Sequence, residues 1–197
     1  QSRKALESID QAEYYLNAVR KNIDETTSTA DKILNYVQIG KPDLVSCDLN
    51  HIVDKAIEPY LSHRHQGITV VKKQQSDLPK CLADPEQLVE VIDNLLSNAV
   101  RSITGDGEIS VMIQMAEKLR EDKEGALAEI IVEDTGIGIA PEYLDNIFIP
   151  GFSKSGSGTG IGLAVVKEII ENHNGEVLVE SKRGKGSRFI VRLPIYE

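Results

Sequence analysis

The sequence predicts an α+β fold, a two-layer α/β sandwich preceded by a long helix. Two observations predict the sandwich: a segment that begins after Asp84 and Pro85 carries apolar residues at helical spacing, and the strand-like segments around it are expected to form antiparallel pairs, the last of them joined across RGKG. A third observation, a heptad pattern in residues 5–37, predicts the long helix.

The heptad pattern consists of apolar or small residues that step alternately by four and three positions. A helix of this length, ending near Gly40 and Pro42, spans about 55 Å at 1.5 Å per residue, too long for one small domain to bury its apolar stripe. We expect a partner helix, in a homodimer or a helical bundle; the alternative is a helix packed within its own chain. The break divides the chain into residues 1–41 and a second domain, residues 42–197. The stripe consists of Ala5, Ile9, Ala12, Leu16, Val19, Ile23, Thr26, Ala30, Ile33 and Val37.

Helices and strands alternate after this break. Asp48 is a suitable N-cap for a helix that reaches about residue 63, with Pro59 as a kink or an end. Asp84 followed by Pro85 is a cap and first-turn signature for the most periodic helix, whose apolar face carries Leu88, Val91, Ile92, Leu95, Leu96 and Ala99. Further helices are expected at 142–147 and 160–172, and strands at 68–72, 80–83, 108–115, 128–133, 176–181 and 187–193.

The composition excludes some function classes. Of the 197 residues, 41% are apolar and 27% charged, as in a soluble globular chain. The formal net charge of -9 argues against nucleic-acid binding, because affinity for a phosphate backbone comes mainly from basic residues. No run of about 18 apolar residues and no signal-peptide pattern occurs, so we expect no membrane contact in this stretch and a cytoplasmic location. The start at Gln1 indicates a piece of a longer protein, which could itself be anchored in a membrane.

The two cysteines are isolated in the sequence. Cys47 and Cys81 lack a CxxC spacing and a neighbouring His/Cys cluster, so we expect neither a metal site nor a disulfide framework. Free cysteines tend to be buried, and we expect both to be small buried or half-buried residues.

A first cluster of polar residues lies on the periodic helix, in DNLLSNAVRSI at 93–103. Asn94, Asn98 and Arg101 are four and three residues apart, so they project from one face while apolar neighbours turn toward the core. An amide oxygen is a suitable ligand for Mg²⁺, which keeps several waters and takes other ligands from substrate phosphates. An ordinary polar helix surface is the alternative explanation.

Two glycine-rich clusters follow. In EDTGIGIA, at 133–140, Asp134 can accept a hydrogen bond from an exocyclic amine such as that of adenine, and Gly136 and Gly138 let the backbone approach a ligand. In GFSKSGSGTGIGLAVVKEII, at 151–170, glycines run into a helix whose N-terminal N–H groups suit phosphates. Each loop alone is also explained as a turn or a mobile loop.

In this order and at these distances, the clusters resemble the catalytic ATP-binding domain of sensor histidine kinases, in the superfamily shared with gyrase B, Hsp90 and MutL. The resemblance runs from about Asp48 to the C-terminus and is carried by NLLSNAVRS, DTGIGI, IFIPGFSK, GTGIGLAVV and GKGSRF. It implies a Bergerat-type ATP-binding fold, ATP and Mg²⁺ as ligands, and ATP-dependent phosphorylation of a histidine with relay to an aspartate of a response regulator. It also makes residues 1–41 the second helix of a dimeric phosphotransfer stem.

The resemblance implies catalytic roles for four residues. Asn98 is the expected Mg²⁺ ligand, and Asn94 beside it is a second ligand or the orienter of the first. Arg101 is expected to contact phosphate. Lys154, at the start of the lid, is assigned to the γ-phosphate.

The resemblance also implies the nucleotide-binding residues. Asp134 receives the adenine amino group, and Gly136 and Gly138 shape the base pocket. Two departures from the family pattern predict modest affinity: Ser102 stands where many relatives carry an aromatic residue that covers the base, and Gly151 replaces a common aromatic residue. The remaining nucleotide-binding residues, of which the glycines flank the phosphates, are Gly158, Thr159, Gly160, Gly162 and Leu163.

The family's acceptor motif, of the form H-[DE]-x-x-x-P, is absent. We interpret His51, His63, His65 and His173 as surface or turn residues. The acceptor histidine is therefore expected outside this stretch, on a first stem helix.

Two other functions are compatible with the same motifs. Hydrolase relatives place a glutamate one helical turn before the metal-binding asparagine as a general base, whereas this chain has Asn94 there and Glu90 a further turn away. Transfer to a positioned acceptor is therefore favoured over hydrolysis. The second alternative is a degenerate domain that holds ATP only as a conformational ligand, against which the intact asparagine and glycine motifs count.

Overall fold

The computed structural model describes residues 39–62, 67–74, 78–116, 126–153 and 159–195, together with scattered residues between 11 and 38, all of them helical. The chain divides into two compact units, Gln1–Gln38 and Ile39–Glu197. Each unit is described by itself, and the assignment of residues 1–41 to a stem stays a prediction. Among the described residues, no helix is both long and apolar enough to cross a membrane.

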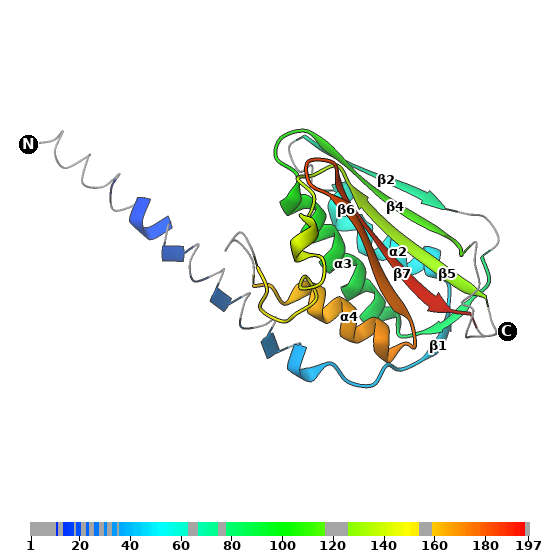
Figure 1. The fold of residues 1–197 in the computed structure, drawn as a ribbon. Helices are drawn as coiled ribbons and strands as arrows, with labels where there is room; N and C mark the ends of the chain where they lie inside the picture. Colours follow the sequence, from blue (N-terminus) through cyan, green and yellow to red (C-terminus); the bar gives the residue numbers. More distant parts are fainter. Residues whose placement is uncertain are drawn as a thin grey trace, which may run out of the picture. The chain divides into compact units, whose positions relative to one another are not determined.

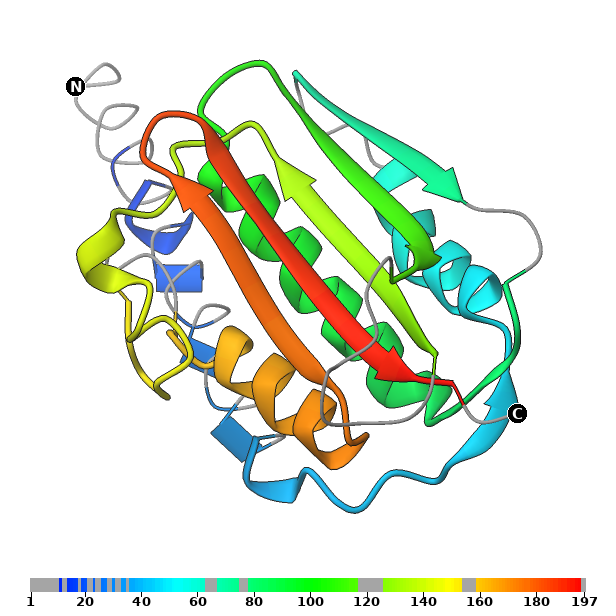
Figure 2. The ribbon, with the colours of Figure 1, turned by 45° about the vertical axis from the view of Figure 1, so that its right-hand side comes forward.

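A five-stranded sheet forms one layer of the second unit (Figures 1 and 2). Its strand order is β2-β4-β5-β7-β6, with β2 parallel to β4 and all other neighbours antiparallel. A separate two-stranded sheet joins β1 and β3. The strands are β1 (Val45–Cys47), β2 (Ile68–Gln74), β3 (Cys81–Ala83), β4 (Gly107–Met115), β5 (Leu127–Asp134), β6 (Glu176–Lys182) and β7 (Gly186–Pro194).

Three helices form the second layer and lie against one face of the sheet (Figure 2). They are α2 (Leu49–Ser62), α3 (Pro85–Ser102) and α4 (Gly162–Asn172). The α3 helix is central, since it packs against both other helices and against β5. The six apolar residues expected to face the core from α3 are all buried. The expected α+β two-layer sandwich is therefore confirmed.

The structure differs from the sequence-based expectation in four places. The β2–β4 pair is parallel, because the chain crosses over through α3 between these two strands. Residues 142–147 do not form an α-helix; a short 3₁₀ helix, η1 (Pro141–Tyr143), is followed by turns. Pro59 does not end α2, which continues to Ser62. The β1 strand was not expected, since three residues are too few for a periodic pattern.

The start of α3 is held by two independent devices. The Asp84 side chain accepts hydrogen bonds from the N–H groups of Glu86 and Gln87 at 3.0 and 3.2 Å, which satisfies two N–H groups that lack helical partners. The Asp84 N–H in turn donates to Nε2 of His173 at 2.9 Å. His173 Nδ1 lies 2.8 Å from the Ile169 carbonyl, to which it donates, so the ring is the neutral tautomer that leaves Nε2 free to accept.

His173 meets the expectation of a surface or turn residue as a turn residue. It occupies the C-terminal turn of α4, as a turn residue would, but it is buried rather than on the surface, with 2% of its area exposed. It connects the end of α4 to the beginning of α3. His51 is exposed, as expected, and His63 and His65 lie outside the described residues.

The turn between β6 and β7 contains two glycines with positive φ, Gly184 at +78° and Gly186 at +93°. At Gly184 an added Cβ would meet nothing within 4 Å. At Gly186 it would lie 1.8 Å from the carbonyl oxygen of Asp134. The chain of β7 therefore passes directly against the end of β5.

We expect His173→Leu to destabilise the second unit by about 1–3 kcal/mol, because it leaves the half-buried Asp84 N–H without its acceptor while keeping a similar side-chain volume. Urea unfolding followed by far-UV circular dichroism measures the change. Asn172→Ala, at the exposed neighbouring position, is the control and should stay within about 0.5 kcal/mol of wild type. Equal stabilities for the two variants would contradict the proposed connection between α3 and α4.

We expect Gly186→Ala to cost about 1–3 kcal/mol more than Gly184→Ala, since only the first forces Asp134 to move. Both variants place a side chain at positive φ, at a cost of roughly 1–2 kcal/mol each, so the difference isolates the contact. The same urea titration, run on both variants, tests this. If the two cost the same, the close approach of β7 to Asp134 is not present in solution.

Candidate functional site

The three clusters singled out in the sequence meet at the C-terminal half of α3. Asn94 on α3 lies against Gly162 at the start of α4, where an added Cβ would come within 2.8 Å of Asn94 Oδ1. Ser102, the last residue of α3, contacts Asp134 and Gly136 of the second cluster. Segments far apart in the sequence are thus brought to one region of the fold.

The polar face of α3 carries the first cluster. Asn94 Nδ2 donates to the Glu90 carbonyl at 3.0 Å, which orients the amide and leaves Oδ1 on the side of Gly162. Asn98 Oδ1 accepts a hydrogen bond from the Arg101 guanidinium. The two asparagines are half-buried and Arg101 is exposed. The result is two oriented amide groups next to one exposed cation.

The donor set decides what kind of metal site the residues can form. Among the described residues, no group of three or more His, Cys, Asp or Glu side chains could hold a metal ion. Asn94 and Asn98 offer neutral amide oxygens, each with a second lone pair. Such a set fits Mg²⁺ that arrives with phosphates and keeps its waters, and does not fit a metal held by the protein alone.

Asp134 is a buried carboxylate at the end of β5, with 5% of its area exposed. Its Oδ1 accepts hydrogen bonds from the Ser102 hydroxyl at 2.7 Å and from the Gly136 N–H at 2.8 Å. Burial raises the pKa of this carboxyl above its ordinary range, while the hydrogen bonds from Ser102, Gly136 and the Ser187 backbone lower it. Because Oδ1 receives both bonds, its orientation is fixed.

Ser102 has a contact that the sequence did not predict. It was noted as a departure from an aromatic residue, and its hydroxyl lies 2.9 Å from the Ala99 carbonyl and 2.7 Å from Asp134 Oδ1. The single hydroxyl hydrogen is shared between these two acceptors. Ser102 lies seven residues after Leu95 on α3, and this helical spacing gives no sign of the contact, because Asp134 belongs to a different element, β5.

The two glycines of the second cluster stand where neighbouring protein atoms leave no room for a side chain. A Cβ on Gly136 would lie 1.9 Å from Ser102 Oγ and 2.6 Å from the Ser102 carbonyl oxygen. A Cβ on Gly138, whose φ is +65°, would lie 2.2 Å from the Lys182 carbonyl oxygen. Glycine at these two positions was expected because it lets the backbone approach a ligand. In the structure, close packing of the chain is already a sufficient reason, since it excludes a side chain.

The third cluster forms a loop that leads into α4. Gly160, at a φ of +66°, packs against Gly151 and Phe152, and the Gly151 N–H donates to the Gly160 carbonyl at 3.0 Å. Thr159 Oγ1 accepts from the Ile161 N–H at 3.3 Å. Within the described part of the chain, no side-chain hydrogen bond caps the N-terminus of α4 at Ile161, and N–H groups at a helix N-terminus are suited to an anion.

The remaining members of the third cluster are placed only in part. Leu163 is half-buried in the first turn of α4, next to Gly162. Lys154 and Gly158 lie outside the described residues, so their expected roles stay predictions.

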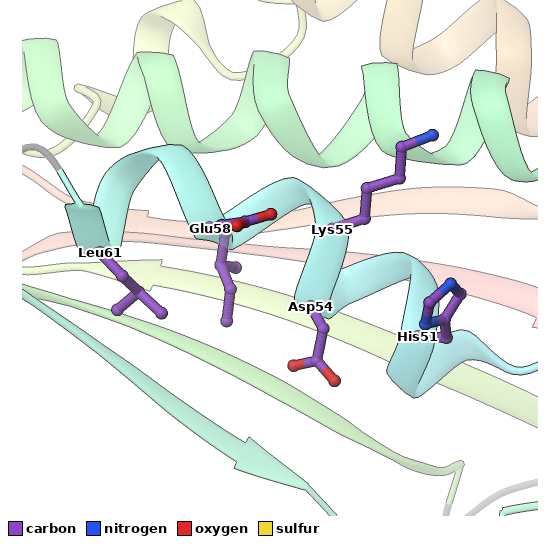
Figure 3. Close-up of a pocket in the computed structure, with 6 residues that line it drawn as sticks. His51, Asp54, Lys55, Glu58 and Leu61 are labelled. Atoms are coloured by element: carbon purple, nitrogen blue, oxygen red, sulfur yellow. The ribbon is translucent and has the colours of Figure 1, made fainter.

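A surface hollow lies elsewhere in the second unit, along α2 (Figure 3). Apart from the buried Ile57, its lining side chains are exposed, and the Asp54 carboxylate pairs with Lys72. It brings together none of the three clusters. Its lining residues are His51, Asp54, Lys55, Ile57, Glu58 and Leu61.

The chain matches known proteins over most of its length. A family model described as "Histidine kinase-, DNA gyrase B-, and HSP90-like ATPase" matches residues 83–197. Sensor histidine kinase ZraS of Escherichia coli (strain K12) is 33% identical over 186 residues, 94% of this chain and 38% of the relative. Sensor-like histidine kinase SenX3 of Mycobacterium tuberculosis (strain ATCC 25618 / H37Rv) is 29% identical over 96% of this chain and 47% of the relative. The chain therefore spans less than half the length of these relatives.

Solved structures of histidine kinases have a fold similar to that of this chain. Full-length ShkA in complex with AMPPNP superposes with a TM-score of 0.77 at 26% identity, covering 92% of this chain and 38% of ShkA. Histidine kinase ThkA in complex with the response regulator protein TrrA has the same fold, with a TM-score of 0.73 at 21% identity over 92% of this chain and 51% of the matched chain. The chain belongs to the family of histidine kinase-, DNA gyrase B- and HSP90-like ATPases and carries the catalytic domain of a sensor histidine kinase.

Proposed function

We propose that this domain binds Mg-ATP and transfers the γ-phosphoryl group to a histidine, as the catalytic part of a two-component signalling protein. The observation that carries the proposal is the meeting of the asparagine face of α3, the buried Asp134 and the open N-terminus of α4 in one region. Kinship with sensor histidine kinases over most of the chain supports it.

Asp134 is proposed to recognise the base. Its Oδ1 accepts hydrogen bonds from Ser102 and Gly136. The exocyclic amine of a ligand is therefore proposed to donate to carboxylate lone pairs that these two hydrogen bonds do not use. Because the carboxylate is buried, this bond is charge-assisted in a medium of low dielectric constant. Ser102, in place of an aromatic ring, provides orientation of the carboxylate rather than stacking.

Asn98 and Asn94 are proposed to hold Mg²⁺ through their amide oxygens, with Asn94 either as second ligand or as orienter of Asn98. When bound, the ion would supply positive charge that neutralises the phosphates. Arg101, now bonded to Asn98 Oδ1 and otherwise exposed, is free to turn to a phosphate. The α4 N-terminus, with Gly158, Thr159, Gly160, Gly162 and Leu163, is proposed to face the phosphates, and Lys154 the γ-phosphate.

The geometry favours transfer over hydrolysis. Hydrolysis needs a general base next to the attacking water. The position one turn before Asn98 is occupied by Asn94, whose amide cannot take up a proton. Glu90 is half-buried, and burial followed by the charge of Asp93 raises the pKa of its carboxyl. It stands about 12 Å from Asn98 along the helix, two turns before this asparagine instead of the one turn at which hydrolase relatives place their general base.

The proposal includes two partners. Exposed apolar residues on the first unit, with 46–75% of their area accessible, are suited to a second copy of the chain in a helical stem: Leu16, Val19, Ile23, Ile33 and Val37. The receiver domain of a response regulator is proposed as the next acceptor of the phosphoryl group, as in the class of assembly that ThkA forms with TrrA.

We expect the chain, mixed with Mg²⁺, labelled ATP and a separate helical stem that carries an acceptor histidine, to label that stem. Asn98→Ala should lower the labelling rate by about 100-fold or more, since the metal loses its amide ligand in a reaction that depends on charge neutralisation. Asn172→Ala, an exposed asparagine at the end of α4, is the matched control and should label normally.

Three outcomes separate the possible functions. Saturable ATP binding without a labelled stem would favour a module that uses ATP as a conformational ligand. Steady release of phosphate without the stem would favour a hydrolase. Normal labelling by Asn98→Ala would show that the metal assignment is wrong while leaving the kinase proposal intact.

We expect Asp134→Asn to bind ATP roughly 10- to 100-fold more weakly, because a charged acceptor for the base is lost. The domain should be at least as stable as wild type at pH 7. The pKa of Asp134 is raised in the folded state, so its contribution to stability is full below about pH 4 and is lost as pH rises through the raised value. The neutral amide of the variant does not ionise and therefore does not lose this contribution. The difference in free energy of unfolding between the variant and wild type should shrink as pH falls toward about 4.

Isothermal titration with ATP and urea unfolding at several pH values measure the two effects. Glu133→Gln, the exposed neighbour on β5, is the control and should leave ATP affinity unchanged. Undiminished affinity in Asp134→Asn would remove this residue from the base pocket.

A further inference from the structure

The two cysteines that appear isolated in the sequence are neighbours in the fold. Cys47 on β1 and Cys81 on β3 are register partners in the antiparallel two-stranded sheet. Their Sγ atoms lie 3.6 Å apart, and both are free thiols. The expectation that both cysteines are buried or half-buried is confirmed, since Cys81 is buried and Cys47 is half-buried.

The backbone already has the spacing that a disulfide needs. Directly opposed residues of antiparallel strands have Cα atoms about 4.5–5.5 Å apart, which falls inside the usual range of about 4.4–6.8 Å for disulfides. Bringing the sulfurs from 3.6 Å to bonding distance therefore needs rotation of the side chains and no movement of the strands.

The environments of the two thiols are different. Burial, followed by the neighbouring Cys47, raises the pKa of the Cys81 thiol to about 12. Cys81 therefore stays protonated at neutral pH. Cys47 is reached by solvent, and its thiol is the one that a small oxidant meets first.

We propose that Cys47 and Cys81 form a reversible disulfide when the protein meets a hydroperoxide. Cys47 Sγ attacks one peroxide oxygen, the O–O bond breaks, and the leaving oxygen takes the Cys47 thiol proton and departs as water or an alcohol, so that Cys47 becomes a sulfenic acid. Cys81 Sγ then attacks the Cys47 sulfur. The S–S bond forms, the S–O bond breaks, and the leaving hydroxyl takes the Cys81 proton as a second water. Two thiols lose two electrons in total, and the peroxide gains them.

The bond would tie down the segment that enters the second unit. This segment is now held to α3 by two hydrogen bonds: the Asp43 N–H donates to Asp84 Oδ2 at 3.1 Å, and Gln87 Nε2 donates to the Gly40 carbonyl at 3.4 Å. A disulfide would add a covalent link and close a loop between residues 34 positions apart. Neither cysteine is among the residues proposed to bind the nucleotide, so the inference does not depend on the proposed function.

The test is treatment of the purified chain with hydrogen peroxide, followed by alkylation of free thiols and intact-mass measurement. We expect wild type to lose about 2 Da, to resist alkylation at both cysteines, and to recover fully with dithiothreitol. Its melting temperature should rise by about 5–10 °C, because the closed loop restricts the unfolded chain.

Two variants serve as controls. Cys47→Ser changes the partly exposed cysteine, so it should fold normally, show no loss of mass and gain no thermal stability on oxidation. Cys81→Ala checks the buried partner and should leave Cys47 open to oxygen addition of about 16 Da per step. The proposal is overturned if wild type only gains oxygen, if it forms covalent dimers instead, or if Cys47→Ser shows the same rise in melting temperature.

Discussion

Burial of one face of α3 against the sheet is the constraint on which the rest of the structure depends. Six apolar side chains on this face are fully excluded from water, and their burial contributes on the order of 10 kcal/mol, comparable to the net stability of a domain. The same helix carries Asn94, Asn98 and Arg101 on its other face. Because a helix is rigid, holding the apolar face in place also fixes the direction of the polar groups.

The two ends of α3 are held in different ways. At the start, the Asp84 cap and the His173 imidazole satisfy N–H groups that would otherwise lack partners. At the end, the Ser102 hydroxyl donates a hydrogen bond to the buried carboxylate of Asp134 on β5. The first end serves stability alone, whereas the second end joins the helix to the proposed base pocket.

A buried carboxylate such as Asp134 is costly for the fold. Desolvation disfavours its charged form, and the bonds from Ser102, Gly136 and Ser187 offset only part of that effect, since its pKa remains raised. Such a group is retained where its charge is used on a ligand. Close chain packing at Gly136 and Gly186 keeps the carboxylate in place, so the backbone itself contributes to the preorganised site.

The sequence alone was sufficient for the local features. Helical spacing on 85–102, the Asp84–Pro85 cap and strand pairing across RGKG were each determined by neighbours within one or two turns. The order of the motifs was sufficient for the family. The burial of a residue type that has several uses was harder to predict: His173 was expected as a surface or turn residue, and it is a turn residue that is buried.

Contacts between distant segments were decided by the tertiary structure alone. The Ser102–Asp134 bond, the pairing of Cys47 with Cys81, the parallel β2–β4 neighbours and the protein atoms packed against Gly136 all join residues that the sequence separates. Periodicity reports only which side of a helix or strand is buried. Which atoms meet there depends on how the elements pack, and that is set by the whole core at once.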